Sequence, residues 1–276
     1  MRQELVSIAT DSYPLDGLLY QPDSKPRGVV QILHGNCANF YTGPSRFLPP
    51  HLLAAGYAVL AYNRRGHDIL ATLNSRRTIG GALQTIAEAV ADNRSARAFL
   101  MQRGFAPPIV VGHSHGGMLA ARHTADHPDT PALVMMSAHG GGPRIMEMVS
   151  AAGLMAGDRL AERRQTASEL VESGNGDDFL LFPGWWHVAS AASFLDYADN
   201  LPETIALAPA IACRSLFLRG TLEPAAIYPG EAFAANSAGR GEFRPVAGGD
   251  HFYTGVEHET AGMILRWLDG ALGRPS

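Results

Sequence analysis

Short, unbroken runs of apolar residues recur along the chain, and stretches with a helical period separate them. The runs cover residues 28–33, 57–62, 109–111, 133–136 and 216–218. Strands without a polar face are typical of a parallel sheet that helices cover on both sides. Parallel strands also need long crossover connections, and the helical stretches stand where these connections belong. This alternation constrains the fold more than any other feature and predicts an α/β protein.

A hairpin at the start of the chain and further periodic stretches complete the pattern. Residues 5–10 and 15–21 alternate polar with apolar side chains and are joined by Ser12, Tyr13 and Pro14, as in a hairpin. Helical periods run over residues 81–103, 118–127 and 261–272, and a strand pattern covers residues 242–246. We therefore predict a mostly parallel, twisted sheet of about eight strands with helices on both faces.

One long segment interrupts this alternation. Residues 141–209 contain helical patterns but no strand pattern, with glycines and Pro143 where the segment begins and Pro209 where it ends. The helical stretches cover residues 144–155, 159–172 and 189–200. An insertion of this length is more typical of a functional lid than of a loop. We predict a core domain of residues 1–140 and 210–276, with a helical lid of residues 141–209 inserted before the next-to-last strand.

The most specific local motif is GHSHGG at residues 112–117. It follows an apolar run and precedes a helical stretch, which is the setting in which a G-x-S-x-G motif presents a nucleophilic serine. The glycines allow the strand and the helix to pass close to the strained serine turn. We predict that Ser114 is the nucleophile and that the backbone N–H of His115 donates to the developing oxyanion. A chance match among 30 glycines is the alternative, and the strand–turn–helix setting argues against it.

These features resemble the α/β-hydrolase family over nearly the whole chain. The HGN step at residues 34–36 resembles the family's oxyanion loop, which implies that Asn36 donates the second backbone N–H. The stretch YNRRGH at residues 62–67 resembles the family's Asp-x-Arg-Gly-x-Gly segment, but Asn63 replaces the acid and Asp68 replaces the second glycine. The two arginines of this stretch, Arg64 and Arg65, are expected to be solvated or to bind a carboxylate near the entrance of the site.

The resemblance also implies the order of the remaining catalytic residues, which is an acid and then a histidine after the last strand. His251 fits this order among 11 histidines, because it follows the strand pattern at residues 242–246. Glu223 follows the preceding strand, where the family usually has an aspartate. Asp250 is its rival, although a side chain adjacent to His251 is expected to point elsewhere. Asp196 and Glu203 in the lid are weaker candidates.

The lid contains a dense aromatic run, FLLFPGWWH at residues 179–187. We expect Phe179, Phe182, Trp185 and Trp186 to line an apolar acyl or alcohol pocket. The alternative is that these side chains and the methionines of the lid form the lid's own core.

Together these residues predict a serine hydrolase that cleaves a carboxylic ester, or a related acyl bond, of a small, largely apolar substrate through an acyl-enzyme on Ser114. Carbon–carbon bond hydrolases, lactonases and amidases use the same triad, so the fold does not choose among these reactions. Haloalkane dehalogenases and epoxide hydrolases are disfavoured because their nucleophile is an aspartate. An alternative of another class is a non-catalytic small-molecule-binding protein on the same scaffold.

Composition argues against other classes of protein. The net charge of −4 provides no basic surface for nucleic acid. The two cysteines, Cys37 and Cys213, lie too far apart in sequence for a typical disulfide framework or zinc motif. No apolar run is long enough to cross a membrane, and the first residues lack the apolar core of a signal peptide. We expect a cytoplasmic monomer or homodimer that acts on a small molecule without cofactor or metal and binds neither nucleic acid nor membranes.

Overall fold

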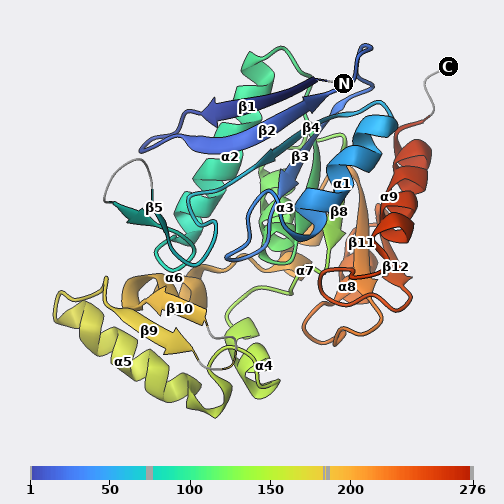
Figure 1. Ribbon diagram of the computed structural model, residues 1–276. Helices are drawn as coiled ribbons and strands as arrows, with labels where there is room; N and C mark the ends of the chain where they lie inside the picture. The colour runs from blue at the N-terminus through green and yellow to red at the C-terminus, as the bar shows by residue number, and fades with distance from the viewer. Residues whose placement is uncertain (1, 73–76, 183, 185–186, 274–276) are drawn as a thin grey trace.

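The computed structural model describes residues 2–72, 77–182, 184 and 187–273, and its central element is an eight-stranded sheet (Figure 1). The spatial order of the strands is β1-β2-β4-β3-β7-β8-β11-β12. In chain order they are β1 (Arg2–Ile8), β2 (Leu15–Gln21), β3 (Val29–Leu33), β4 (Ala58–Tyr62), β7 (Ile109–His113), β8 (Ala132–Met136), β11 (Arg214–Gly220) and β12 (Gly241–Val246). In this sheet the pairs β1–β2 and β2–β4 are antiparallel, and the remaining five pairs are all parallel. The predicted mostly parallel sheet and its opening hairpin are confirmed.

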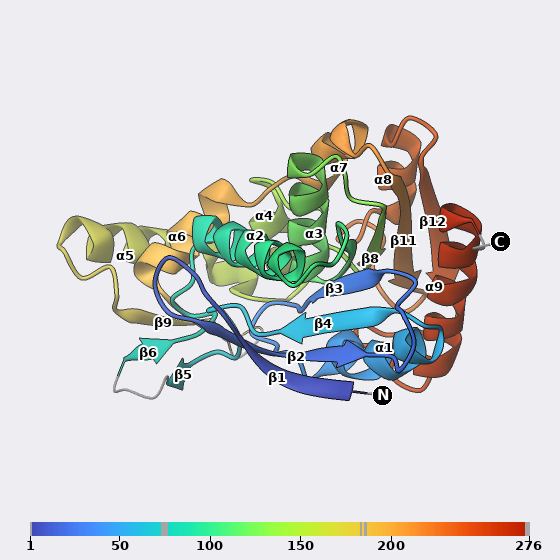
Figure 2. The ribbon, with the colours of Figure 1, turned by 90° about the horizontal axis from the view of Figure 1, so that it is seen from above.

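Helices cover both faces of the sheet, as predicted (Figure 2). On one face lie α2 (Ile86–Gln102), α3 (His115–Asp126) and α8 (Gly230–Asn236), and on the other lie α1 (Gly43–Ala54) and α9 (Glu257–Leu272). Successive side chains of β8 enter different cores: Leu133 and Met135 pack on the α2 and α3 side, while Val134 and Met136 pack on the α1 and α9 side. This double burial is the reason why the strands read as unbroken apolar runs.

Helix α2 begins at Ile86, five residues later than the periodicity indicated. Thr85 forms a capping box with Glu88: its hydroxyl accepts the Glu88 N–H at 3.3 Å, and the Glu88 carboxylate accepts the Thr85 N–H at 2.9 Å. These two bonds satisfy N–H groups that the first turn leaves without partners, and they fix the start of the helix.

The chain between β8 and β11 forms a smaller layer beside the carboxyl ends of the parallel strands (Figure 1). Its elements are α4 (Ile145–Ala151), α5 (Leu160–Glu172), β9 (Phe179–Phe182), β10 (His187–Ser190) and α6 (Ala191–Asn200), with a short 3₁₀ turn at Gly157–Arg159. The chain then returns to the core, where α7 (Thr204–Leu207) and a 3₁₀ turn at Ala208–Ala210 pack on α3 and α8. The expectation of helices alone is wrong here, because β9 and β10 pair as antiparallel strands. Each is only four residues long, too short for a period of two to show in the sequence.

A second small pair of strands, β5 (Ala71–Thr72) and β6 (Thr78–Ile79), projects from the loop that follows β4. No helix in the described ranges combines the length and apolar character needed to cross a membrane.

Candidate active site

Ser114 stands in a sharp turn between β7 and α3. Its φ of 56° and ψ of −125° are unusual for a residue with a side chain and place it under backbone strain. The neighbouring glycines are required by close approaches: a Cβ at Gly112 would lie 2.2 Å from the Gly116 carbonyl oxygen, and one at Gly116 would lie 2.3 Å from the His34 carbonyl oxygen. The motif therefore encodes a turn that presents the serine hydroxyl at the end of the sheet.

The structure brings Ser114, His251 and Glu223 into one hydrogen-bonded chain. His251 Nε2 lies 3.0 Å from Ser114 Oγ, and His251 Nδ1 lies 2.7 Å from Glu223 Oε1. An ionised carboxylate only accepts hydrogen bonds, so Nδ1 carries the proton and Nε2 of the neutral ring accepts the serine O–H. This is the arrangement in which a histidine can take a proton from a serine hydroxyl.

Two donors hold the second oxygen of the Glu223 carboxylate. Glu223 Oε2 accepts the Gly220 N–H at 2.9 Å and the Ser137 hydroxyl at 2.5 Å. Because the Ser137 proton is directed to the carboxylate, the Tyr253 hydroxyl is the donor toward Ser137 Oγ at 2.8 Å, and it shares its proton with the Leu218 carbonyl oxygen at 3.3 Å. These contacts fix the carboxylate with its other oxygen toward His251.

The rival acids are engaged elsewhere. Asp250 Oδ1 accepts the N–H groups of Phe252 and Thr254, both at 2.9 Å, and hydrogen bonds of this kind lower the pKa of its carboxyl group. Asp196 accepts the Ile86 N–H at 2.6 Å at the start of α2. Glu203 precedes α7 and takes part in an isolated bridge with Gly141. None of these contacts involves the ring of His251.

His113 supports His251 from behind rather than competing with it. Its Nε2 lies 2.7 Å from the His251 carbonyl oxygen, so the ring donates to that oxygen. Burial, together with the nearby His251 ring, lowers the pKa of His113 to about 3, which keeps the ring neutral at ordinary pH.

Asn36 and His115, the two predicted oxyanion donors, flank Ser114. His115 is the first residue of α3, so its N–H has no acceptor within the helix. No hydrogen bond between described residues uses the Asn36 N–H. The two side chains are joined by Tyr197 of α6, whose Oη lies 2.9 Å from Asn36 Oδ1 and 3.0 Å from His115 Nε2. No motif in the sequence indicated this role of Tyr197.

Two cavities meet at Ser114. A cleft of about 280 Å³ contacts Ser114, Asn36, His251 and Phe252. A smaller cavity of about 60 Å³ contacts Ser114 and His115, and its walls are mainly apolar: Ile145, Met146, Val149, Met155 and Leu201.

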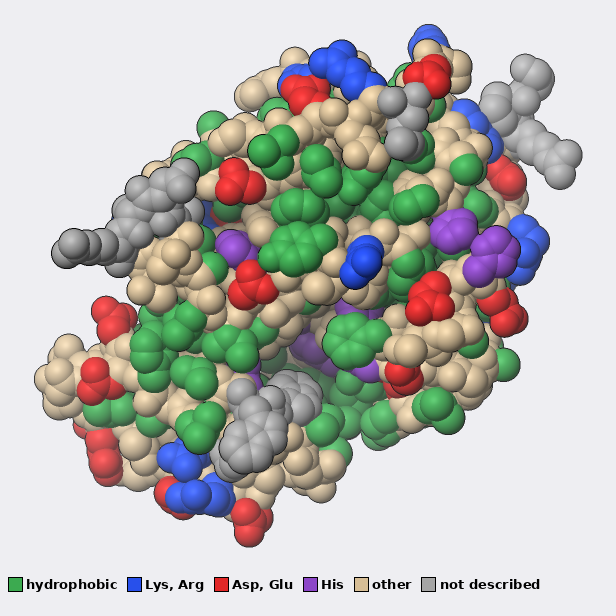
Figure 3. Space-filling view, viewed as in Figure 1, with side chains coloured by type: hydrophobic (Ala, Val, Ile, Leu, Met, Phe, Trp, Pro, Cys, Tyr) green, Lys and Arg blue, Asp and Glu red, His purple; other side chains and the backbone are tan. Residues whose placement is uncertain are grey.

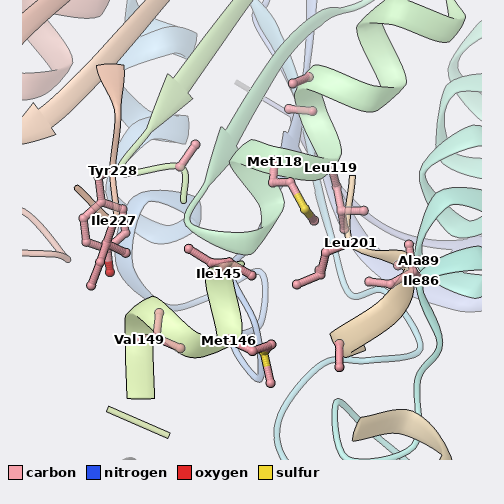
Figure 4. Packing of buried hydrophobic residues seen from close by; sticks show 14 of the residues in the cluster. Ile86, Ala89, Met118, Leu119, Ile145, Met146, Val149, Leu201, Ile227 and Tyr228 are labelled. Carbon is pink, nitrogen blue, oxygen red and sulfur yellow. The ribbon is translucent and has the colours of Figure 1, made fainter. Parts of the chain in front are cut away.

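The figures show how these walls are placed. Figure 3 shows histidine side chains at the bottom of a hollow between the sheet domain and the smaller layer. In Figure 4, Ile145, Met146 and Val149 lie on α4, with Met118 and Leu201 above them on neighbouring elements. One face of α4 therefore supplies much of the smaller cavity's wall.

The predicted pocket lining needs correction. Phe182 is fully buried and packs on Phe194 with ring centroids 4.7 Å apart, inside the smaller layer. Phe179 is 48% exposed and contacts a separate groove that does not include Ser114. Side chains alternate between the two faces of β9, so Leu180 and Phe182 point inward while Phe179 points outward. Trp185 and Trp186 lie outside the described residues.

Comparison with known proteins places the chain among related sequences and folds. A family described as alpha/beta hydrolase fold matches residues 28–177, more than half of the chain. A monoacylglycerol lipase of Mycolicibacterium smegmatis is 29% identical over 123 residues, which cover 43% of this chain and 40% of that protein.

Solved structures with the same fold match nearly the whole chain. Est1E from Butyrivibrio proteoclasticus superimposes with a TM-score of 0.72 at 16% identity, covering 98% of this chain and 99% of the other. A thermostable carboxyl esterase from Bacillus coagulans gives 0.73 at 16% identity and 99% coverage of both chains. Together with the family match over residues 28–177, these likenesses show that the chain belongs to the alpha/beta hydrolase fold family.

Proposed function

We propose that this protein is a serine hydrolase that cleaves a carboxylic ester of a small, largely apolar substrate through an acyl-enzyme on Ser114. The observation that carries the proposal is the continuous chain from Ser114 Oγ to His251 at 3.0 Å and from His251 to Glu223 at 2.7 Å. The known esterases and the lipase that resemble the chain support an ester as the substrate.

Acylation follows from this geometry. His251 Nε2 takes the Ser114 proton while Oγ forms a bond to the substrate's carbonyl carbon, and the carbonyl π electrons move onto its oxygen. The N–H groups of Asn36 and His115 donate to this oxyanion. Loss of one such donor costs on the order of 3 kcal/mol of transition-state stabilisation. The intermediate then expels the alkoxide leaving group, which receives the proton from His251.

Water completes the cycle through the same groups. His251 Nε2 takes a proton from water as the water oxygen attacks the acyl carbon, and Ser114 Oγ leaves with that proton. Glu223 stays ionised throughout, holds the Nδ1–H tautomer and stabilises the imidazolium that forms in each half-reaction. The products are a carboxylic acid and an alcohol.

The two cavities take different parts of the substrate. His251 must reach the leaving oxygen to protonate it, and His251 contacts the larger cleft but not the smaller cavity. The alcohol part therefore lies in the larger cleft and the acyl part lies among the apolar walls under α4. In this proposal residues 141–209 act as a lid whose first helix sets the length of acyl chain that fits.

The test is hydrolysis of p-nitrophenyl esters from acetate to decanoate by the wild type and by Ser114→Ala. We expect activity on the short esters, a decline with chain length, and loss of activity in the variant. A fluorophosphonate probe should label the wild type and not the variant. A wild type that is labelled but inactive on every ester would replace the ester proposal by a carbon–carbon, amide or lactone substrate. A wild type that is neither active nor labelled would overturn the enzyme proposal in favour of a non-catalytic small-molecule-binding protein.

A further inference from the structure

Arg64 is an arginine whose side chain is almost completely buried and forms no ion pair with the residues that the structure describes. It is 1% exposed, whereas the sequence led us to expect a solvated residue or an anion-binding residue at the entrance. Among the described residues it forms no ion pair, and its Nε and Nη1 atoms have no hydrogen-bond partner. A guanidinium keeps its charge even when buried, although burial lowers the pKa of Arg64. Burial of an unpaired charge is costly, so this residue needs an explanation.

The adjacent residue, Arg65, shows what a structurally paired arginine in this loop looks like. Its Nη2 lies 2.6 Å from Asp92 Oδ1 and 2.8 Å from Asp11 Oδ1, and its Nε lies 2.8 Å from Asp92 Oδ1. Asp92 also accepts from Gln84 at 3.2 Å. Both carboxylates are thus hydrogen-bonded to Arg65, and neither forms a hydrogen bond with Arg64, although the charge of Asp92 still acts on Arg64 from a distance.

The hydrogen bonds of Arg64 go to the loop that carries Asn36. Its Nη2 donates to the His34 carbonyl oxygen at 2.8 Å and to the Gly35 carbonyl oxygen at 3.4 Å. The Gly35 oxygen also lies 2.8 Å from His34 Nδ1. The backbone N–H of Arg64 donates to His34 Nε2 at 3.0 Å, so the proton of the neutral His34 ring is on Nδ1 and is donated to Gly35.

Two donors therefore converge on the carbonyl oxygen of Gly35, one of them cationic. This carbonyl and the Asn36 N–H belong to the same peptide unit, whose electrons are delocalised over O, C and N. Donors on the oxygen draw electron density from the nitrogen and make the N–H a stronger donor, as in chains of cooperative hydrogen bonds. The charge of Arg64 also reaches the second donor residue: burial is the main cause of the lowered pKa of His115, and the charge of Arg64 adds to it.

We propose that Arg64 is a positioning residue that holds and polarises the Gly35–Asn36 peptide, and that its unpaired charge is compensated when the oxyanion forms. This inference rests on the proposed function, because it needs a reaction that places negative charge between Asn36 and His115. A fixed cation behind a donor stabilises an anion that appears only in the transition state, so its effect falls on kcat rather than KM.

Three substitutions separate charge from hydrogen bonding. Arg64→Gln keeps amide donors and removes the charge, Arg64→Lys keeps the charge, and Arg122→Gln neutralises an exposed arginine of α3 as the matched control. We expect Arg64→Gln to lower kcat by about 10²-fold with little change in KM, Arg64→Lys to keep most of the activity at low pH, and the control to match the wild type.

The pH profile of Arg64→Lys gives a second test that does not depend on Arg64→Gln folding. Burial lowers the pKa of a lysine, whereas an arginine stays charged. The kcat of Arg64→Lys should therefore fall as pH rises, with a limb that the wild type lacks. The proposal is overturned if folded Arg64→Gln keeps kcat within about threefold of the wild type, or if Arg64→Lys shows no such limb.

The rate of fluorophosphonate labelling at Ser114 keeps this test separate from the choice of substrate. The phosphoryl oxygen of the probe uses the same two donors, so labelling should slow in Arg64→Gln even if p-nitrophenyl esters are not hydrolysed. A labelled wild type that is inactive on esters overturns the ester proposal alone. Equal labelling rates in the wild type and Arg64→Gln overturn the role of Arg64 alone, and no labelling of the wild type overturns both.

Discussion

The hydroxyl of Ser137 donates a 2.5 Å hydrogen bond to Glu223 Oε2, the carboxylate oxygen that His251 does not use. Ser137 directly follows β8 and has a φ of 47°, in the left-handed region that residues with side chains rarely adopt. Strain of this kind persists where the surrounding structure fixes the residue. Here the strained turn directs the Ser137 hydroxyl, at the end of β8, toward Glu223, which follows β11. The orientation of the Glu223 carboxylate therefore depends on the ends of both strands.

We expect Ser137→Ala to lower kcat about tenfold with little change in KM, because the carboxylate keeps the Gly220 N–H but loses its second donor on Oε2. The measurement is steady-state hydrolysis of a short p-nitrophenyl ester. Ser215→Ala is the matched control, since Ser215 is a fully buried serine whose Oγ has no hydrogen-bond partner in the described structure. Equal kcat values in the two variants would contradict a role for Ser137 in holding the acid.

Substitution of the two rival acids distinguishes their roles. Glu223→Gln should lower kcat by about 10³- to 10⁴-fold, because an amide no longer fixes the Nδ1–H tautomer or stabilises the imidazolium. Asp250→Asn should keep most of the kcat, since its oxygen still accepts from Phe252 and Thr254 in the turn before α9. Both are measured at saturating substrate. A larger loss in Asp250→Asn than in Glu223→Gln would reverse the assignment.

The residues of the hydrogen-bonded chain could be predicted from sequence because each follows the end of a strand. Ser114 is marked by a local motif, and His251 and Glu223 follow from strand order, which brings their loops to the same edge of a parallel sheet. The role of Glu223 still had competitors in the sequence. The hydrogen bonds of Asp250 to its own turn distinguish the two acids, and such contacts depend on backbone geometry that spacing alone does not reveal.

The features that the sequence did not predict depend on packing between distant segments. Helix α1 at residues 43–54 is not among the predicted helices, and it forms although it contains Pro49 and Pro50. The two arginines of the loop after β4 look equivalent in sequence, yet Arg65 meets Asp92 of α2 while Arg64 turns under the Asn36 loop. Apolar composition indicated a pocket in the lid but did not show that α4, rather than β9, faces Ser114.

The wall that α4 contributes gives a prediction about chain length. Met146→Ala should shift the preferred ester toward longer acyl chains, because it removes side-chain volume from the smaller cavity. It should also lower the free energy of unfolding by about 2–5 kcal/mol, since Met146 is buried. Met148→Ala, on the same helix but outside the cavity wall, is the control. If both variants keep the wild-type chain-length profile, the acyl chain does not lie under α4.

His123 predicts a dependence of stability on pH that is separate from catalysis. It is 3% exposed in α3, and its Nε2 has no hydrogen-bond partner among the described residues. Burial is the main reason why the pKa of His123 falls from 6.5 to about 3, and the charges of His127 and Arg97 add to this effect. The folded state therefore keeps the ring neutral at a pH where the unfolded chain binds a proton. The stability that the protein gains from keeping His123 neutral is fully present above pH 6.5, the pKa in the unfolded chain, and is lost as pH falls toward the folded-state pKa of about 3.

The test compares the wild type with His123→Gln by urea unfolding at two pH values. Between the pKa of 6.5 in the unfolded chain and about pH 5, the wild type should lose about 2 kcal/mol more of its free energy of unfolding than the variant does. The comparison is made within each protein, so a general destabilisation by the substitution cancels. His258→Gln, at an exposed position in α9, should keep the wild-type pH dependence. If His123→Gln also keeps it, protonation of His123 does not contribute to the loss of stability at low pH.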